Sequence, residues 1–431
     1  MLAFVFGRPR RREADPAFPR LHARPALGWV NDPNGCAYVD GRYHVFFQYN
    51  PAGPVHAAIC WGHMSSADLV RWREEPIALV PRPGELDRYG CWSGCVLDDG
   101  GIPTAAYSAV RDAEARSVVL LARSDRRMRT WRQERDPVAP VPAGPAISHA
   151  RDPFVFTLDG RRYAIQGAGH SALPGAARVL VYDCDDLTSW TALGALLTID
   201  DPIAAQVAPA HIWECPNLVR LGDRWVLIVS LWSSVGGEHR LGGVSYLVGE
   251  LGLEDGTPRF TPTAGGSLDR GPCFYAPQVL SRDDRTLLWG WAREHGRGQE
   301  EIDRAGWAGA LTFCRELSLA DGTLRSRPAA ELGSLRRHDF DVQPHTPFTA
   351  EAFELEVGSG VASLWLVDGG GEELVAASRG RARMLVDGSV VEVFDTLPAP
   401  LTTRAYPTAT SAWVLRAAAP PVAAWRLGVE L

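Results

Sequence analysis

Three carboxylates, Asp32, Asp152 and Glu214, stand at matching places in short β-like segments of this sequence. Taken singly, each has an ordinary explanation, since Asp32 lies in a turn-forming Asn-Asp-Pro-Asn-Gly run and Asp152 precedes a proline. A shared position favours function, because acids packed together repel one another and cost stability unless their chemistry is used. Paired carboxyl groups cleave glycosidic bonds: one protonates the leaving oxygen while the other attacks the anomeric carbon or activates water.

The matching places belong to an internal repeat of about sixty residues. Asp32, Ser93, Asp152, Glu214 and Tyr275 open five successive segments, separated by 61, 59, 62 and 61 residues. Each segment contains two β-like runs around a Gly/Asp turn, which is a hairpin signal. Repeats of several strands without helical periodicity are typical of a β-propeller, whose innermost strands line a central channel. We therefore expect the five opening residues to meet at one mouth of that channel.

The repeat predicts an all-β protein of two domains. Residues 25–325 are expected to form a five-bladed β-propeller, and residues 339–431, where the repeat is lost and alternating apolar runs appear, a β-sandwich. Residues 326–338 are expected to be a linker. Residues 1–24 are expected to be a flexible N-terminal extension.

Tryptophans occur in two groups with different expected roles. Three of them recur at two steps of 59 residues and are interpreted as structural, namely Trp72, Trp131 and Trp190. Other aromatic residues lie beside the carboxylate segments and are candidates for stacking on the C–H faces of a sugar, namely Trp29, Trp61, Trp92, Tyr275, Trp289 and Trp291.

Composition excludes several classes of partner. The formal net charge of −7 argues against nucleic acid, although basic residues cluster at Arg8, Arg10, Arg11 and Arg12. No stretch approaches the roughly 18 consecutive apolar residues of a membrane helix. The apolar run at residues 1–6 is too short for a signal peptide and precedes its arginines, so we expect a cytoplasmic protein. Composition does not indicate an oligomeric state.

The 8 cysteines show no metal-site spacing, so we expect neither a metal nor another cofactor. We interpret them as free thiols in a reducing compartment, four disulfides being the alternative. Several crowd the carboxylate segments, where we expect small buried apolar side chains rather than a redox switch.

Motifs along nearly the whole chain resemble glycoside hydrolase family 32, the invertase, levanase and inulinase group. The motifs occur in the family's order: Trp29–Gly35 (WVNDPNG), Phe46–Pro51 (FFQYNP), Trp61–His63 (WGH), Trp92–Gly94 (WSG), Arg151–Pro153 (RDP), Glu214–Pro216 (ECP), Phe274–Gln278 (FYAPQ) and Val386–Phe394 (VDGSVVEVF). The resemblance implies a five-bladed propeller followed by a β-sandwich, which agrees with the fold expected from the repeat. Val30, Trp92 and Asn217 depart from common family residues, and the sandwich is shorter than usual.

The resemblance also implies roles. Asp32 matches the nucleophile, Glu214 the general acid/base, and Asp152 the acid that holds fructose hydroxyls and stabilises the transition state. Arg151 is expected to help keep Asp152 charged. The residues expected to bind the substrate are Asn31, Gln48, Trp61, Trp92, Ser93, Arg151, Tyr275 and Trp291.

The first functional hypothesis is therefore a retaining β-fructofuranosidase that releases terminal fructose from sucrose or short fructans. Three alternatives remain open: an inverting arabinanase-like glycosidase, a fructosyltransferase, and a sugar-binding propeller without catalysis. A separation of about 5–5.5 Å between the two carboxyl groups indicates retention, and about 6.5–9.5 Å indicates inversion.

Overall fold

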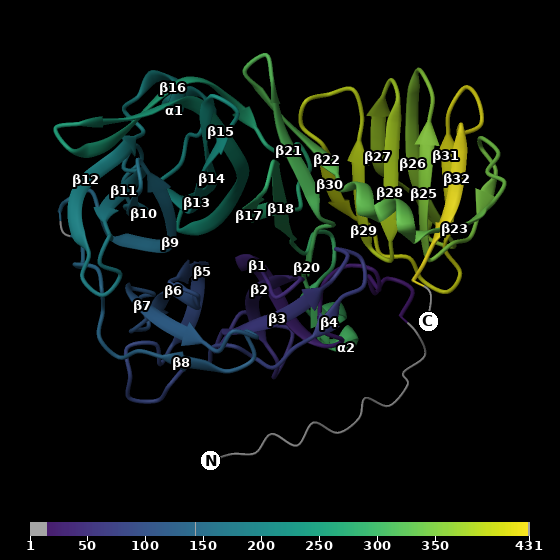
Figure 1. The fold of residues 1–431 in the computed structure, drawn as a ribbon. Helices are drawn as coiled ribbons and strands as arrows, with labels where there is room; N and C mark the ends of the chain where they lie inside the picture. The colour runs from purple at the N-terminus through teal and green to yellow at the C-terminus, as the bar shows by residue number, and fades with distance from the viewer. Residues whose placement is uncertain (1–14, 143, 430–431) are drawn as a thin grey trace.

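The computed structural model describes residues 15–142 and 144–429 (Figure 1). The arginine cluster from Arg8 to Arg12, the apolar run at residues 1–6 and most of the expected N-terminal extension lie outside the described residues. Strands dominate the described chain, so the predicted all-β class is confirmed. No helix in this part of the chain is long and apolar enough to cross a membrane.

The predicted propeller is present, with five blades of four main strands each (Figure 1). Blade I contains β1 (Gly28–Val39), β2 (Arg42–Asn50), β3 (Cys60–Ser66) and β4 (Arg73–Glu74). Blade II contains β5 (Gly90–Asp99), β6 (Ile102–Val110), β7 (Ser117–Ser124) and β8 (Trp131–Gln133). Blade III contains β9 (His149–Leu158), β10 (Arg161–Gly169), β11 (Arg178–Asp183) and β12 (Thr191–Thr198). Blade IV contains β13 (Ile212–Leu221), β14 (Arg224–Val235), β15 (Glu238–Glu254) and β16 (Thr257–Ser267). Blade V contains β17 (Phe274–Arg282), β18 (Arg285–Ala292), β21 (Arg315–Ala320) and β22 (Thr323–Pro328).

The first strands of the blades form a closed ring. β1 contacts β5, β5 contacts β9, β9 contacts β13, β13 contacts β17, and β17 contacts β1 again. A short strand, β19 (Trp307–Ala308), pairs in parallel with β1 and ties the end of the propeller to its beginning. β20 (Ala310–Leu311) pairs with β18. The helices are short: α1 (Pro202–Val207), α2 (Gln299–Ala305) and the 3₁₀ helix η1 (Ala330–Leu335).

Hairpin turns occur where the Gly/Asp pairs predicted them. Asp40 and Gly41 between β1 and β2 have φ angles of 50° and 76°, and Asp159 and Gly160 between β9 and β10 have 50° and 81°. Two successive left-handed residues are the geometry of a type I′ turn, which matches the twist of the strands that it joins.

Two of the three repeated tryptophans, Trp131 and Trp190, stabilise the blades, as interpreted from the sequence. Nε1 of Trp190 donates a hydrogen bond to the carbonyl of Leu187 at 2.9 Å, and Nε1 of Trp131 donates to that of Met128 at 3.1 Å. Each indole therefore satisfies a carbonyl three residues earlier, while its ring packs against the apolar core between blades.

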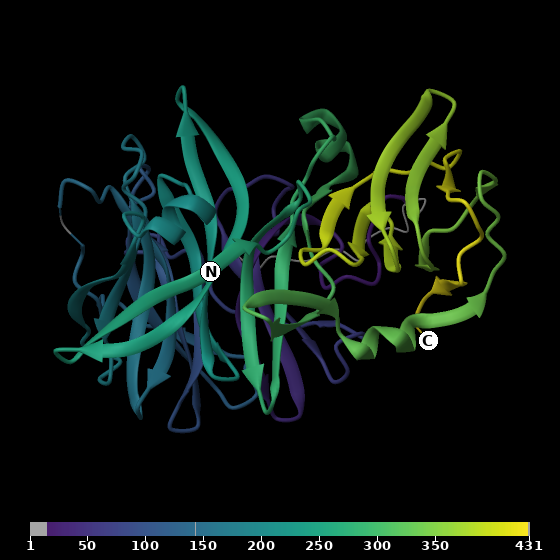
Figure 2. The ribbon, with the colours of Figure 1, turned by 90° about the horizontal axis from the view of Figure 1, so that it is seen from above.

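The C-terminal domain is a β-sandwich that lies beside the propeller (Figure 2). One sheet has the order β23 (Arg336–Asp339), β32 (Ala423–Leu427), β25 (Ala352–Val357), β28 (Ala382–Asp387), β29 (Val390–Phe394) and β30 (Leu401–Arg404). The other has the order β24 (Pro347–Phe348), β31 (Ala412–Arg416), β26 (Val361–Asp368) and β27 (Gly371–Arg379). Phe353, Leu364 and Trp413 are among the buried side chains between the two sheets.

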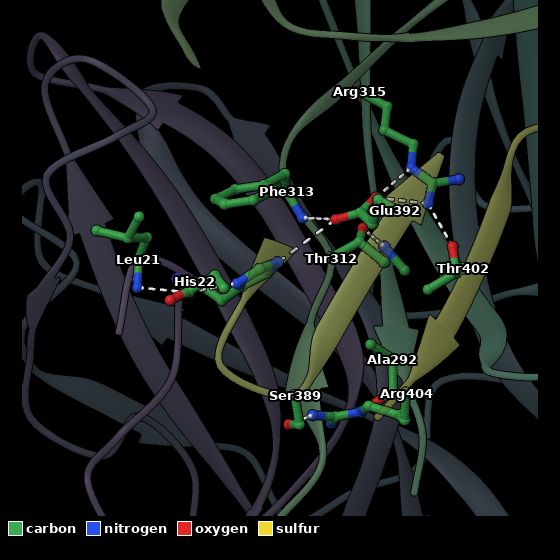
Figure 3. A network of polar contacts seen from close by, with 12 residues as sticks. Leu21, His22, Ala292, Thr312, Phe313, Arg315, Ser389, Glu392, Thr402 and Arg404 are labelled. Carbon is green, nitrogen blue, oxygen red and sulfur yellow. Dashed lines mark hydrogen bonds and ion pairs between the residues drawn. The ribbon is translucent and has the colours of Figure 1, made fainter. Parts of the chain in front are cut away.

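A buried charge network joins the two domains (Figure 3). Arg315 of blade V donates to Glu392 of the sandwich at 2.6 Å and to Asp269 at 2.8 Å, and its side chain is 0% exposed. His22 lies between Asp387 at 2.7 Å and Glu392 at 3.4 Å. Burial alone would lower the pKa of His22, but the bonds to the two acids raise it.

Two boundary segments pack against the domains beside them. In the described end of the extension, residues 15–24, Leu21 and His22 are buried against the sandwich, where their backbone N–H groups donate to Asp387. Residues 326–338, the expected linker, carry secondary structure. They contain the end of β22, the helix η1 with its buried Leu332 and Leu335, and part of β23, which pairs with β32. Apolar burial and hydrogen bonds to Asp387 hold the first segment in place, and apolar burial with strand pairing holds the second.

Candidate active site

One mouth of the propeller channel opens into a cavity of about 1040 Å³. Side chains from all five blades line it, and they include Asp32, Trp92, Asp152, Glu214 and Tyr275. Ser93 lies just behind this lining and bonds Asp32. The structure thus brings together the residues that open the five repeats.

A β-bulge aims each of these residues into the channel. The pairing register of every first strand shifts at or beside its opening residue. In four blades the shift lies between Val30 and Pro33, Trp92 and Gly94, Glu214 and Asn217, and Tyr275 and Gln278. In blade III it lies in β9, opposite the stretch of β10 between Ile165 and Gly167. Four of the bulges contain a proline, which has no N–H to give to a ladder. Bulges bend a strand and redirect its side chains, so the repeat carries a device for presenting functional groups.

Asp32 is held by hydrogen-bond donors on both carboxylate oxygens. Nδ2 of Asn31 donates to Oδ1 at 3.0 Å. Oγ of Ser93 donates to Oδ2 at 2.7 Å, and Nε2 of Gln48 donates to the same oxygen at 3.0 Å. This arrangement fixes the carboxylate as an acceptor, the form in which it is a nucleophile.

The two aspartates have raised pKa values. Burial raises the pKa of Asp32 to about 6; the Ser93 hydrogen bond opposes this rise and the charge of Glu214 adds to it. Burial likewise raises the pKa of Asp152 to about 7, with the charge of Arg151 opposing and that of Glu214 adding. Burial and mutual repulsion are the two causes expected where acids are gathered for catalysis.

Glu214 has a different set of partners. Arg151 donates to Oε1 through Nε at 2.9 Å and Nη2 at 2.7 Å, and the hydroxyl of Tyr275 donates to Oε2 at 2.7 Å. The guanidinium of Arg151 was expected to help keep Asp152 charged. It does lower the pKa of Asp152 through its charge, but its hydrogen bonds go to Glu214.

Asp152 is positioned through the backbone. Its own N–H donates to Oγ of Ser108 at 2.7 Å, and its Oδ2 accepts from the N–H of Cys215 at 2.9 Å. Asp152 and Cys215 have left-handed φ angles of 62° and 45°, which the bulges impose. No described residue donates a hydrogen bond to Oδ1 of Asp152, so this oxygen is available to a ligand.

The expected aromatic residues take different positions. Trp92 and Trp291 line the cavity, and the buried Nε1 of Trp291 has no hydrogen-bond partner within the described chain. Trp61 was expected to contact substrate, but its side chain is 0% exposed and outside the cavity lining. Its Nε1 donates to the carbonyl of Trp92 at 3.0 Å, so it supports the strand that carries Trp92 and Ser93.

Sequence reasoning missed several lining residues because they lie outside the repeated positions. His56 packs between Trp29 and Trp92, with ring centroids 6.0 and 5.5 Å away, and its Nε2 lies 3.2 Å from Oε1 of Gln48. Burial lowers the pKa of His56, so the ring is neutral at pH 7. His149, Arg240 and Arg293 line the cavity as well. The sequence around these three residues carries no recurring signal.

The cysteines are all free and buried. Burial raises the pKa of Cys215 well above its usual range, so this thiol beside the carboxylates is not a ready nucleophile. Within residues 15–142 and 144–429, no group of three or more His, Cys, Asp or Glu side chains is arranged to hold a metal ion.

A propeller with a carboxylate-lined channel mouth, joined to a β-sandwich, defines a glycoside hydrolase, and comparison with known proteins gives the family. The model of the glycosyl hydrolases family 32 N-terminal domain matches residues 22–328. The chain therefore belongs to glycoside hydrolase family 32, and the resemblance seen in the sequence is confirmed.

Several relatives and solved structures are similar over most of the chain. Sucrose-6-phosphate hydrolase of Klebsiella pneumoniae is 37% identical over 342 residues, which cover 78% of this chain and 71% of the relative. That of Zymomonas mobilis is 32% identical over 426 residues, covering 90% and 80%. The structure of Bombyx mori GH32 beta-fructofuranosidase BmSUC1 matches with a TM-score of 0.80 at 24% identity, covering 96% of this chain and 94% of that one. The last similarity shows the fold alone, and it agrees with the propeller and sandwich described above.

Proposed function

We propose that this glycoside hydrolase releases terminal β-linked fructose from sucrose or short fructans by double displacement with retention. The observation that carries the proposal is that Asp32, Asp152 and Glu214 line one cavity. Asn31 and Ser93 hold Asp32 there, and Arg151 and Tyr275 hold Glu214. A small carbohydrate fits the cavity of about 1040 Å³. The names of the relatives, sucrose-6-phosphate hydrolases, support this substrate class.

In the first step, an oxygen of Asp32 attacks the anomeric carbon of fructose while Glu214 gives its proton to the departing oxygen. A fructosyl ester on Asp32 forms, and the bond to the leaving group breaks. In the second step, Glu214 takes a proton from water, whose oxygen attacks the same carbon and releases the Asp32 carboxylate.

Asp152 is proposed to hold fructose hydroxyls through its available Oδ1. Hydrogen bonds of this kind strengthen as the oxocarbenium-like transition state forms, because the hydroxyls become more polarised. Trp291, which lines the cavity, is proposed to contact the sugar with its ring. Asn31, Gln48 and Ser93 are proposed to position Asp32, and Tyr275 to position Glu214.

The alternatives are distinguished by the product. An inverting enzyme has no covalent intermediate, and a sugar-binding propeller releases no fructose. A retaining enzyme run in aqueous methanol gives methyl β-fructofuranoside, whereas inversion gives the α-anomer. Comparison of fructose with fructosyl oligosaccharides at high sucrose concentration measures transfer against hydrolysis.

A variant pair tests the two roles. Glu214→Gln should lose sucrose cleavage by several orders of magnitude yet retain cleavage of an aryl β-fructofuranoside, whose leaving group needs little protonation. Asp32→Asn should lose both, because nucleophilic attack is common to them. External azide should partly rescue Glu214→Gln on the aryl substrate. Equal losses on the two substrates, without an azide effect, would assign the acid/base to another residue.

We also propose that the protein works in the cytoplasm and binds neither nucleic acid nor membrane. The eight buried free thiols support a reducing compartment. Cell fractionation followed by an activity assay tests this, and activity found outside the cytoplasm would contradict it.

A further inference from the structure

Two arginines extend beyond the acid/base carboxylate on neighbouring blades. In blade IV, Glu214 pairs with Ser230, and Arg240 pairs with Ser233 further along the same strand. At about 3.3 Å per residue along β14, the Ser233–Arg240 pair lies about 10 Å past the Ser230–Glu214 pair. β13 begins at Ile212, close to this point, so the β14–β15 hairpin continues past the channel mouth.

Blade V repeats this placement. Tyr275, which bonds Glu214, pairs with Trp291, and Arg293 follows two residues later. Along the strand direction, the backbone of Arg293 therefore lies about 7 Å beyond the Tyr275–Trp291 pair. Both arginines line the cavity that contains the carboxylates. They flank the place where the leaving group of the proposed reaction must lie.

The positive charges of these arginines are not used within the protein. The guanidinium of Arg240 forms no ion pair or hydrogen bond with another described residue. Nε of Arg293 donates to the carbonyl of Pro272 at 2.8 Å, and its two terminal nitrogens contact no described acceptor. By contrast, Arg151 in the same cavity forms an ion pair with Glu214 through two of its nitrogens.

Other ionisable side chains that line this cavity include a histidine of blade IV and an acid of blade II. His239 also lines the cavity, with its ring 4.9 Å from that of Trp232. Glu114 lines the cavity from the loop after β6 in blade II, which is not a neighbour of blade IV. The carboxylate of Glu114 lies 3.5 Å from the guanidinium of Arg116. The side of the cavity next to Glu214 is therefore basic.

We propose that Arg240 and Arg293, with His239, bind a phosphate group carried by the leaving sugar. The inference rests on the proposed function and specifies its substrate: a fructoside whose other sugar is a phosphomonoester. Arginine suits this task because its planar fork donates two parallel hydrogen bonds to phosphate oxygens. A distance of about one sugar ring from the acid/base matches a phosphate on the exocyclic carbon of a leaving hexose.

The test compares kcat/KM for sucrose 6-phosphate, with the phosphate on glucose, and for sucrose. Wild type should prefer the phosphorylated substrate at least tenfold. Arg240→Gln and Arg293→Gln should each reduce that preference about tenfold or more, since a hydrogen bond to a charged group is worth that much in affinity. Arg224→Gln is the matched control, because Arg224 begins the same strand β14 at its far end and pairs with Glu250. It should leave the preference unchanged.

A second measurement does not depend on turnover of the variants. Glucose 6-phosphate should inhibit wild type more strongly than glucose, and Arg240→Gln should remove the difference. Wild-type activity on sucrose without any preference for the phosphorylated form would overturn this inference and leave the proposed function standing. Equal losses on both substrates in the two variants would overturn it as well. Failure of wild type to release fructose from either substrate would overturn the proposed function.

Discussion

Replacing Ser93 by alanine should shift the acidic limb of the pH–activity profile to higher pH. The Ser93 hydroxyl donates to Oδ2 of Asp32 at 2.7 Å and lowers the pKa of this acid, which burial raises to about 6. A hydrogen bond to a charged group contributes about 1.5–3 kcal/mol, and one pKa unit corresponds to about 1.36 kcal/mol. Its loss should therefore raise the pKa of Asp32 by about 1 to 2 units.

The kinetic consequence follows from the fraction of Asp32 that is ionised. With a pKa of about 6, about nine-tenths of wild type carries the charged nucleophile at pH 7. With a pKa of about 7 to 8, the variant carries it in between about half and about a tenth of molecules. Gln48 still donates to Oδ2 at 3.0 Å, which favours the smaller shift.

The assay is kcat/KM for sucrose between pH 4 and pH 9, which reports the free enzyme. Ser171→Ala is a suitable control, because Ser171 lines the same cavity but bonds no carboxylate. The acidic limb of Ser93→Ala should move upward, with activity partly recovered at high pH, while the control keeps the wild-type profile. A uniform loss at all pH values would refute the idea that Ser93 tunes Asp32.

Further predictions concern stability and cofactors. At pH 8, Asp32→Asn should have a higher melting temperature than wild type, and the difference should shrink to nothing near pH 4. The pKa of Asp32 is about 6 in the folded protein and 3.8 ordinarily, so wild-type stability falls as the pH rises from about 4 through 6. The gain is at most about 3 kcal/mol, and a difference in melting temperature that does not vary with pH would contradict the sign. Arg315→Met should cost about 3–5 kcal/mol in urea unfolding because it leaves Glu392 and Asp269 buried and unpaired. Adding Glu392→Gln should restore part of this loss, and a single-variant cost below about 1 kcal/mol would show that the network is dispensable. Exhaustive dialysis against EDTA should leave activity unchanged, and a loss reversed only by a divalent cation would reveal a metal requirement.

The propeller could be predicted because its repeat places equivalent residues in equivalent positions. Strands with the same spacing and turns must build similar sheets, and the first strand of each must face the axis. The convergence of Asp32, Asp152 and Glu214 follows from that register alone. Their individual roles do not, because spacing says nothing about the donors that surround each oxygen.

Features that depend on long-range packing could not be predicted. The position of Trp61 depends on the backbone of Trp92, which it meets from the neighbouring blade. His22 and Glu392 are 370 residues apart in sequence, and neither carries a local signal for burial beside the other. Arg240 and Arg293 belong to a hairpin end and a loop, where no periodicity indicates which side chains face the cavity.

The most direct test of the mechanism is to trap the covalent intermediate. Glu214→Gln mixed with an aryl β-fructofuranoside should accumulate fructosyl-enzyme, because the ester still forms but its hydrolysis lacks a base. Peptide mass spectrometry after rapid acid quenching should find one fructosyl group, attached to Asp32. No adduct during turnover, or an adduct on Asp152 instead, would contradict the assignment of Asp32 as the nucleophile.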